Sequence, residues 1–205
     1  MALPTCILLA QEQGTPPGEI YGPPRFTQAK LPDGAVQFTD QEMGVSFTMP
    51  AGWRLEGNGL RFMDRGWRGN GPGNIATTLP LHHRHADESI WLYYCVFRHV
   101  HSLTADQVDR WYDQEIDDKI SERQQQEKLK GYRVRTSSYE REEIGGRRAL
   151  AWVADFRDGK IAMVEYLVWV RSDRILVEFS IRCRASELDA ARKDVEPMVQ
   201  SVRMP

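Results

Sequence analysis

The strongest constraint on the fold is a run of strict alternation near the C-terminus. Between residues 175 and 184, apolar side chains occupy every second position: Ile175, Val177, Phe179, Ile181 and Cys183. The intervening positions are mostly polar. Successive side chains of a β-strand point to opposite faces, so a period of two predicts a strand with two different faces. The chain must therefore build a sheet around this segment.

Two further runs precede this strand and share its character. Residues 148–156 alternate, and residues 161–171 are apolar on much of both faces. Asp158-Gly159 and residues 172–174 separate the runs and are typical of tight turns. With residues 132–140 as a first strand, the pattern predicts an antiparallel meander of four strands.

The rest of the chain predicts helices as well as strands. Residues 90–101 are apolar on both faces, and such a strand needs a layer above and below it. Thr104 and Gln107 form a capping box that opens a long helix, which we expect to stop at Gly131. A last helix begins at Ser186, with Pro197 expected to kink it. Short strands are expected at 36–39 and 45–49, followed by an irregular segment over 64–89.

The N-terminal part divides into two segments. Residues 1–10 are apolar and give way at once to polar residues, which is typical of the end of a signal peptide. We therefore expect an exported, periplasmic protein, and a lipoprotein anchored at Cys6 is the alternative. Residues 11–34 are rich in Pro and Gly and predict an extended tail. Residues 35–205 are expected to form a single domain.

Composition excludes two classes of protein. The chain has 27 basic and 29 acidic side chains, whereas nucleic-acid binding normally needs a basic excess. No apolar run approaches the roughly 20 residues of a membrane-spanning helix. Cys95 and Cys183 lie in apolar runs, and the sequence leaves open whether they form a disulfide.

Several local sequences resemble the PsbP/Mog-like superfamily. These are residues 47–53 (FTMPAGW), residues 144–149 (IGGRRA) and the segment from Pro197 to Val202. The resemblance covers roughly residues 35–203. It implies an α+β fold with a central antiparallel sheet and helices on both faces, an α/β/α sandwich. Members of this superfamily mostly bind or assemble rather than catalyse, so the resemblance implies a non-catalytic module.

The segment over residues 64–89 provides the candidate contact residues. Long irregular segments in compact domains are often functional. Arg65, Trp67 and Arg68 lie in a Gly-rich stretch, and an exposed tryptophan suits a partner interface. We therefore expect these three residues to bind a partner, either a protein or a small ligand.

All five histidines lie between His82 and His101. Imidazoles suit zinc, copper and nickel, and a site needs three or four ligands that converge. The candidate ligands are His83, His85, His99 and His101. A solvated loop and strand end explains the same residues without a metal.

The sequence holds no motif of a known catalytic class, such as Gly-x-Ser-x-Gly. The favoured hypothesis is thus an exported, non-catalytic binding or assembly module without a cofactor and without a nucleic-acid partner. The alternative is a metal-binding protein or a metal-assisted hydrolase that uses the histidines from His82 to His101.

Overall fold

The computed structural model describes residues 19–20, 26–55, 60–64, 74–83, 91–98, 104–126, 129–135 and 140–205. Most of these residues belong to one large antiparallel sheet of ten strands. Along its main path the strands are β1 (Glu19–Ile20), β6 (Leu60–Asp64), β7 (Asn74–His83), β8 (Trp91–Arg98), β13 (Ile175–Arg184), β12 (Ile161–Arg171), β11 (Arg147–Asp158) and β10 (Glu140–Ile144). Two short strands complete it: β5 (Trp53–Leu55) pairs with β7, and β9 (Lys130–Val134) pairs with β11.

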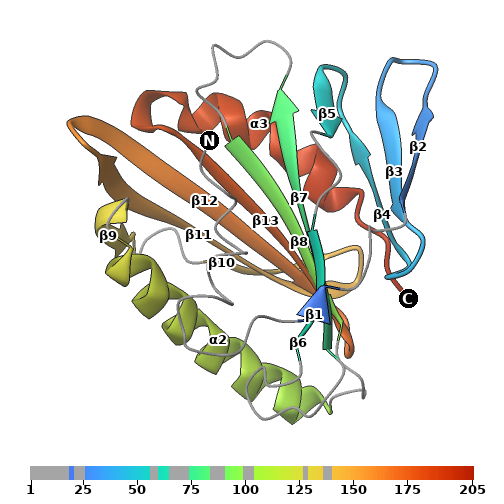
Figure 1. Ribbon diagram of the computed structural model, residues 1–205, viewed down its shortest axis with the longest axis horizontal. Helices are drawn as coiled ribbons and strands as arrows, with labels where there is room; N and C mark the ends of the chain where they lie inside the picture. The colour runs from blue at the N-terminus through green and yellow to red at the C-terminus, as the bar shows by residue number, and fades with distance from the viewer. Residues whose placement is uncertain are drawn as a thin grey trace.

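A second, smaller sheet consists of β2 (Phe26–Lys30), β3 (Val36–Asp40) and β4 (Val45–Met49). The helix α3 (Leu188–Gln200) contacts β4, β12 and β13, and so lies between the two sheets on one face of the large sheet. The helix α2 (Ala105–Gln125) runs along the other face (Figure 1). The expected α+β fold, with helices on both faces of a central antiparallel sheet, is confirmed.

The alternation along β13 explains this layering. Phe179 and its apolar neighbours at every second position face α3 and the small sheet. The ring of Phe179 lies 5.2 Å from that of Phe47 in β4 and 5.8 Å from that of Tyr94 in β8, between ring centroids. On the other face of the large sheet, β11 and β12 contribute Trp152, Leu167 and Trp169 to a second apolar core, which packs beneath α2. Both faces of these central strands are thus covered.

The expectation of an irregular segment over residues 64–89 is wrong in part, because residues 74–83 form β7. β7 contains Pro80, and proline lacks the N–H that a central strand needs. The neighbouring strands accommodate it. β6 pairs with β7 as far as Thr78, and β5 takes over from Leu81, so Pro80 lies between the two partners.

Two other expectations also change. The helix α2 ends at Gln125, and Gly131 instead lies within β9 with a φ of 72°. The Pro/Gly-rich segment 11–34 contains two strands, since β1 pairs with β6 and β2 pairs with β3. Pairing across a sheet edge orders short segments that have no hydrophobic pattern of their own. The last helix does form, and α3 continues through Pro197.

The register separates the two cysteines of the folded part. Cys95 lies opposite Glu178 in the β8–β13 pairing. Cys183 belongs to the apolar core on the α3 face, where it is a free, buried thiol. Burial, with a smaller contribution from Glu187, raises the pKa of this thiol to about 12. The open question of a Cys95–Cys183 disulfide is therefore answered in the negative.

Truncation of Phe179 tests the placement of the core. Phe179→Ala should lower the free energy of unfolding by about 3–5 kcal/mol, because it removes a fully buried aromatic ring. Chemical denaturation of the two proteins measures this difference. The control is Ile161→Ala, at a side chain that is 49% exposed, for which we expect a change below about 1 kcal/mol. Equal stabilities of Phe179→Ala and the wild type would contradict the assignment.

Candidate functional site

The expected contact residues Arg65, Trp67 and Arg68 lie outside the described residues. Their position along the chain is nevertheless informative. Asp64 at the end of β6 pairs with Asn74 at the start of β7, so residues 65–73 connect two antiparallel neighbours. The contact role of these three residues stays a prediction.

Of the candidate histidines, the structure describes His83, at one end of the β7–β8 pair. His83 is the last residue of β7 and lies opposite Trp53 of β5. β8 ends at Arg98, opposite Ile75. The eight residue steps from Ile75 to His83 span about 26 Å of strand, so His83 lies about that far from the end of β8. His85, His99 and His101 lie outside the described residues. Within the described part of the chain, no three His, Cys, Asp or Glu side chains are grouped as metal ligands.

The described residues instead bring together a set of charged and polar side chains between α2 and the large sheet. We call this set the polar layer: Lys119, Arg123, Tyr132, Glu165, Trp169, Glu178, Ser180 and Arg182. Strand alternation puts Glu178, Ser180 and Arg182 on the face of β13 opposite Phe179. The helical period puts Lys119 and Arg123 on one face of α2, four residues apart.

Glu165 of β12 is the centre of the polar layer. Its carboxylate has no exposed surface and accepts hydrogen bonds on both oxygens. Tyr132 Oη donates to Oε2 at 2.7 Å, and Arg123 Nε donates to the same oxygen at 3.3 Å. Ser180 Oγ and Arg182 Nε each donate to Oε1 at 2.9 Å. One side chain thus connects α2, β9, β12 and β13.

The electrostatics of Glu165 follow from these contacts. Burial alone would raise the pKa of the carboxyl group. The positive charges of Arg123 and Arg182, with the hydrogen bonds from Tyr132 and Ser180, outweigh burial and hold the pKa of Glu165 well below its usual range. Burial and the Glu165 charge together raise the pKa of the Tyr132 hydroxyl. Glu165 is therefore ionised and Tyr132 is neutral at physiological pH.

A second buried carboxylate completes the polar layer. Glu178 accepts hydrogen bonds from Lys119 Nζ at 3.1 Å and from Trp169 Nε1 at 2.8 Å. The Oε2 atom of Glu178 also lies 2.9 Å from Lys119 Nζ and forms an ion pair with it. Both side chains are almost completely buried. Glu122, beside them on α2, has a raised pKa because of its burial. The buried glutamates of β12 and β13 therefore each have a cation from α2.

The polar layer suits positioning rather than proton transfer. A general acid or base needs a pKa near the working pH and an accessible proton. Glu165 meets neither condition, because four donors occupy its oxygens and its pKa is strongly lowered. Buried ion pairs whose carboxylates accept several hydrogen bonds can specify one geometry of packing, here that of α2 on the sheet.

The sequence contained a signal for this layer. Glu165 interrupts an apolar run (residues 161–170), as does Glu178 in the next strand. A lone carboxylate in a strand that is apolar on both faces predicts a buried, paired charge. The pairing with Lys119 and Arg123, which are 42 or more residues away, could not be inferred from local patterns.

A hollow on the α3 side is the other described feature with the character of a site. Its volume is about 490 Å³, and it lies between α3 and the β10–β11 turn. Its lining includes Glu143, Gly145, Tyr166, Arg192 and Glu196. The Arg192 guanidinium lies 4.8 Å from the centroid of the Tyr166 ring and pairs with Glu196 at 3.3 Å. This hollow, which we call the α3–β10 hollow, is polar and open to solvent.

The architecture matches a solved structure closely enough to assign the fold. Cyanobacterial PsbP from Synechocystis aligns with 84% of this chain and 94% of its own, at 9% identity and a TM-score of 0.53. The chain has a PsbP-like fold. LpqN of Mycobacterium tuberculosis, described as involved in cell envelope biogenesis, aligns with 88% of this chain and 91% of its own, at 10% identity and a TM-score of 0.44.

The likeness to cyanobacterial PsbP establishes the fold and no more, since fold alone does not define function. No protein-family model matches the chain, and no curated protein matches its sequence. Among the described helices, neither is long and apolar enough to span a bilayer.

Replacement of Glu165 tests the polar layer. At neutral pH, Glu165→Gln should lower the free energy of unfolding by about 3–5 kcal/mol, because the buried Arg123 would lose its carboxylate. The folded-state pKa of Glu165 is lowered, so its ionic contribution is complete above the unfolded carboxyl pKa of about 4.3. It is lost as the pH falls through the lower folded value. The stability difference between wild type and variant should therefore shrink in acid.

Urea denaturation of both proteins at a series of pH values measures this difference. The matched control is Asp155→Asn, which breaks an ion pair with Arg135 whose two side chains are 52% and 40% exposed. Solvent screens that pair, so its loss should cost less than about 1 kcal/mol. A Glu165→Gln protein as stable as the Asp155→Asn protein would show that the polar layer does not hold α2.

Proposed function

We propose that the protein is an exported, non-catalytic binding or assembly module that contacts its partner through one end of the large sheet. The two buried carboxylates support the non-catalytic part of the proposal. Glu165 and Glu178 are almost completely removed from water, and their oxygens already accept hydrogen bonds from donors of the fold. These two carboxylates therefore stabilise the fold and are not free to act in catalysis.

The observation that carries the proposal is the register of the strands. The end of β6 at Asp64, the start of β7 at Asn74 and the end of β8 at Arg98 lie in one row across the sheet. The row continues through the β12–β13 turn at residues 172–174 and the β10–β11 turn at Gly145. We call this side of the molecule the turn end; the strands converge on it in Figure 1.

The turn end has the properties of a recognition surface. Binding residues are often carried by loops that a rigid scaffold positions. Residues 65–73, with Arg65, Trp67 and Arg68, begin and finish at the turn end, because Asp64 and Asn74 are paired there. The α3–β10 hollow opens beside the same end, through Glu143 and Gly145. We therefore place the contact surface on these two neighbouring features, with a protein or a small polar ligand as the partner.

Partner capture with surface variants tests this function. Trp67→Ala and Glu196→Lys should each lose partners that the wild type retains from an extract of the native envelope, because they alter the connection and the hollow. Lys30→Ala, at an exposed residue of the small sheet, is the control and should keep the full set. Deletion of residues 64–89 is unsuitable, since it would remove β7 from the sheet. Identical partner sets for all four proteins would refute the turn end as the contact surface.

Export is a separate part of the proposal and has its own measurement. The change from the apolar residues 7–10 to the polar residues 11–13 supports cleavage at this point. Cell fractionation followed by mass analysis of the N-terminus should find a mature protein that begins near Gln11. An acylated Cys6 would indicate the lipoprotein instead, and an intact Met1 in the cytosol would contradict export.

A further inference from the structure

The end of the large sheet opposite the turn end carries a concentration of positive charge. It consists of β9 and the β11–β12 hairpin, which are neighbours because Arg157 pairs with Lys130 and Asp158 pairs with Ile161. Pairing between β12 and β13 begins only at Met163, so the tip of the hairpin extends beyond β13. Figure 1 shows the hairpin projecting at the left of the molecule. We call residues 130–135 and 155–162 the basic hairpin end.

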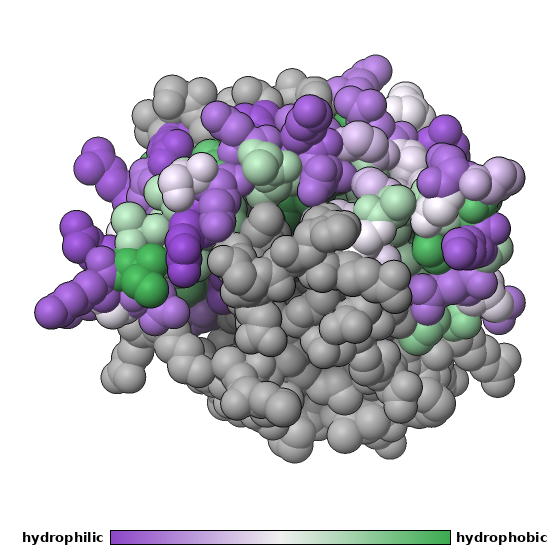
Figure 2. All heavy atoms as spheres, turned by 90° about the horizontal axis from the view of Figure 1, so that it is seen from above, coloured by the Kyte–Doolittle hydropathy of each residue, from purple (hydrophilic) through white to green (hydrophobic). Residues whose placement is uncertain are grey.

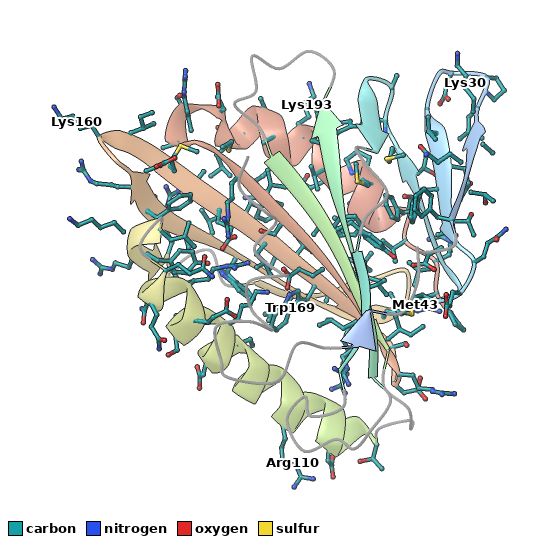
Figure 3. All side chains as sticks on the ribbon, in the orientation of Figure 1. Lys30, Met43, Arg110, Lys160, Trp169 and Lys193 are labelled. Atoms are coloured by element: carbon teal, nitrogen blue, oxygen red, sulfur yellow. The ribbon has the colours of Figure 1, made fainter. Side chains whose placement is uncertain are left out.

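Five basic and two acidic side chains lie in these two segments, although the whole chain has 29 acidic against 27 basic residues. One of the two acids is already neutralised, since Asp155 accepts a hydrogen bond from Arg135 Nε at 2.8 Å. The remaining cations are exposed: Lys130, Arg133, Arg157 and Lys160. Lys160 points away from the ribbon at the tip of the hairpin (Figure 3). The molecule is therefore polarised, with an acidic excess elsewhere and a positive end here.

The tip also carries an exposed apolar side chain. Ile161 is 49% exposed. Among the described residues, it is the only large hydrophobic residue that is exposed. It directly follows Lys160 and lies opposite Asp158. Figure 2 shows a hydrophobic spot surrounded by hydrophilic side chains at this end of the molecule. An isolated isoleucine at a projecting tip has no role in the core of the monomer.

We propose that the basic hairpin end docks on the surface of a bilayer that contains anionic phospholipids. Lysine and arginine side chains near a bilayer are attracted to anionic headgroups. Ile161 at the tip enters the boundary between headgroups and acyl chains, while Lys160 beside it extends its charge back to the phosphates. The acidic excess of the remaining surface orients the protein with this end toward the lipid and leaves the turn end free.

The shape of this end favours lipid over an acidic protein. A protein interface gains most of its affinity from anchors that fill a closely fitting pocket or lie in a desolvated centre. The basic hairpin end is instead a projection with a single exposed isoleucine among exposed cations. A fluid headgroup layer accepts such a projection without a matching pocket. This inference is independent of the proposed partner surface, because it involves the opposite end of the sheet.

Co-sedimentation of the full chain with vesicles tests the proposal. One set of vesicles contains phosphatidylcholine alone, and the other contains equal amounts of phosphatidylcholine and phosphatidylglycerol. We expect binding to the anionic vesicles at low salt, weak or no binding to the neutral ones, and release at high salt, because screening shortens the range of the attraction. Absence of binding to anionic vesicles at low salt would overturn the proposal.

Variants then assign the binding to this end. Combined Arg157→Glu and Lys160→Glu should weaken vesicle binding at least about tenfold, since two attractive charges become repulsive. Ile161→Ser should weaken it about threefold or more and keep the salt dependence, because it removes the apolar contact alone. The control is Arg174→Glu in the β12–β13 turn, at an exposed residue on the opposite end of β12, which should bind like the wild type. All these changes are at exposed positions, and circular dichroism verifies that the variants fold.

Two further results would also overturn the proposal. If Arg174→Glu reduced binding as much as the double variant, the attraction would be a general charge effect rather than a property of the hairpin. If Ile161→Ser bound vesicles as tightly as the wild type, and polyglutamate competed fully with the vesicles, the end would be a site for an acidic protein. Both outcomes leave the partner surface at the turn end unaffected.

Discussion

A single buried carboxylate connects the helix α2 to three strands of the large sheet. Glu165 accepts hydrogen bonds from α2, β9 and β13 while it lies in β12, and its own surface is fully removed from water. A charge in such a place is tolerated only when donors surround it completely. The position of α2 therefore follows from the need to bring Arg123 to Glu165, and the adjacent Lys119–Glu178 pair repeats the same requirement one turn earlier in the helix.

Different interactions therefore stabilise the packing on the two faces of the large sheet. On the α3 face, apolar side chains of α3, β4 and β13 exclude water without directional contacts, and aromatic rings at centroid distances near 5 Å fill the space between the sheets. On the α2 face, a smaller apolar cluster surrounds directional, charge-assisted hydrogen bonds. Hydrophobic burial supplies most of the stability of such a domain, whereas the ion pairs define which way α2 lies.

The two proposed contact surfaces lie at opposite ends of the large sheet. At the turn end, several connections meet beside the polar α3–β10 hollow, which suits recognition of a specific partner. At the basic hairpin end, positive charge and one exposed isoleucine suit a surface without a defined shape. A PsbP-like fold that carries both could hold a partner at a membrane, with the rigid central strands between the two contacts.

Local pattern determined much of the fold. The alternation in β11 and β13, the capped helix from Thr104 and the apolar stripe of α3 depend on neighbours in sequence, and each formed near its expected position. The tertiary structure alone decided the rest. β7 is a strand because β6 and β5 share its pairing on either side of Pro80, and Gly131 belongs to β9 because β11 is there to pair with it. The polar layer depends in the same way on partners that are distant in the chain: a sequence shows that a carboxylate interrupts an apolar strand, but which cation neutralises it is decided by how the helix packs against the sheet.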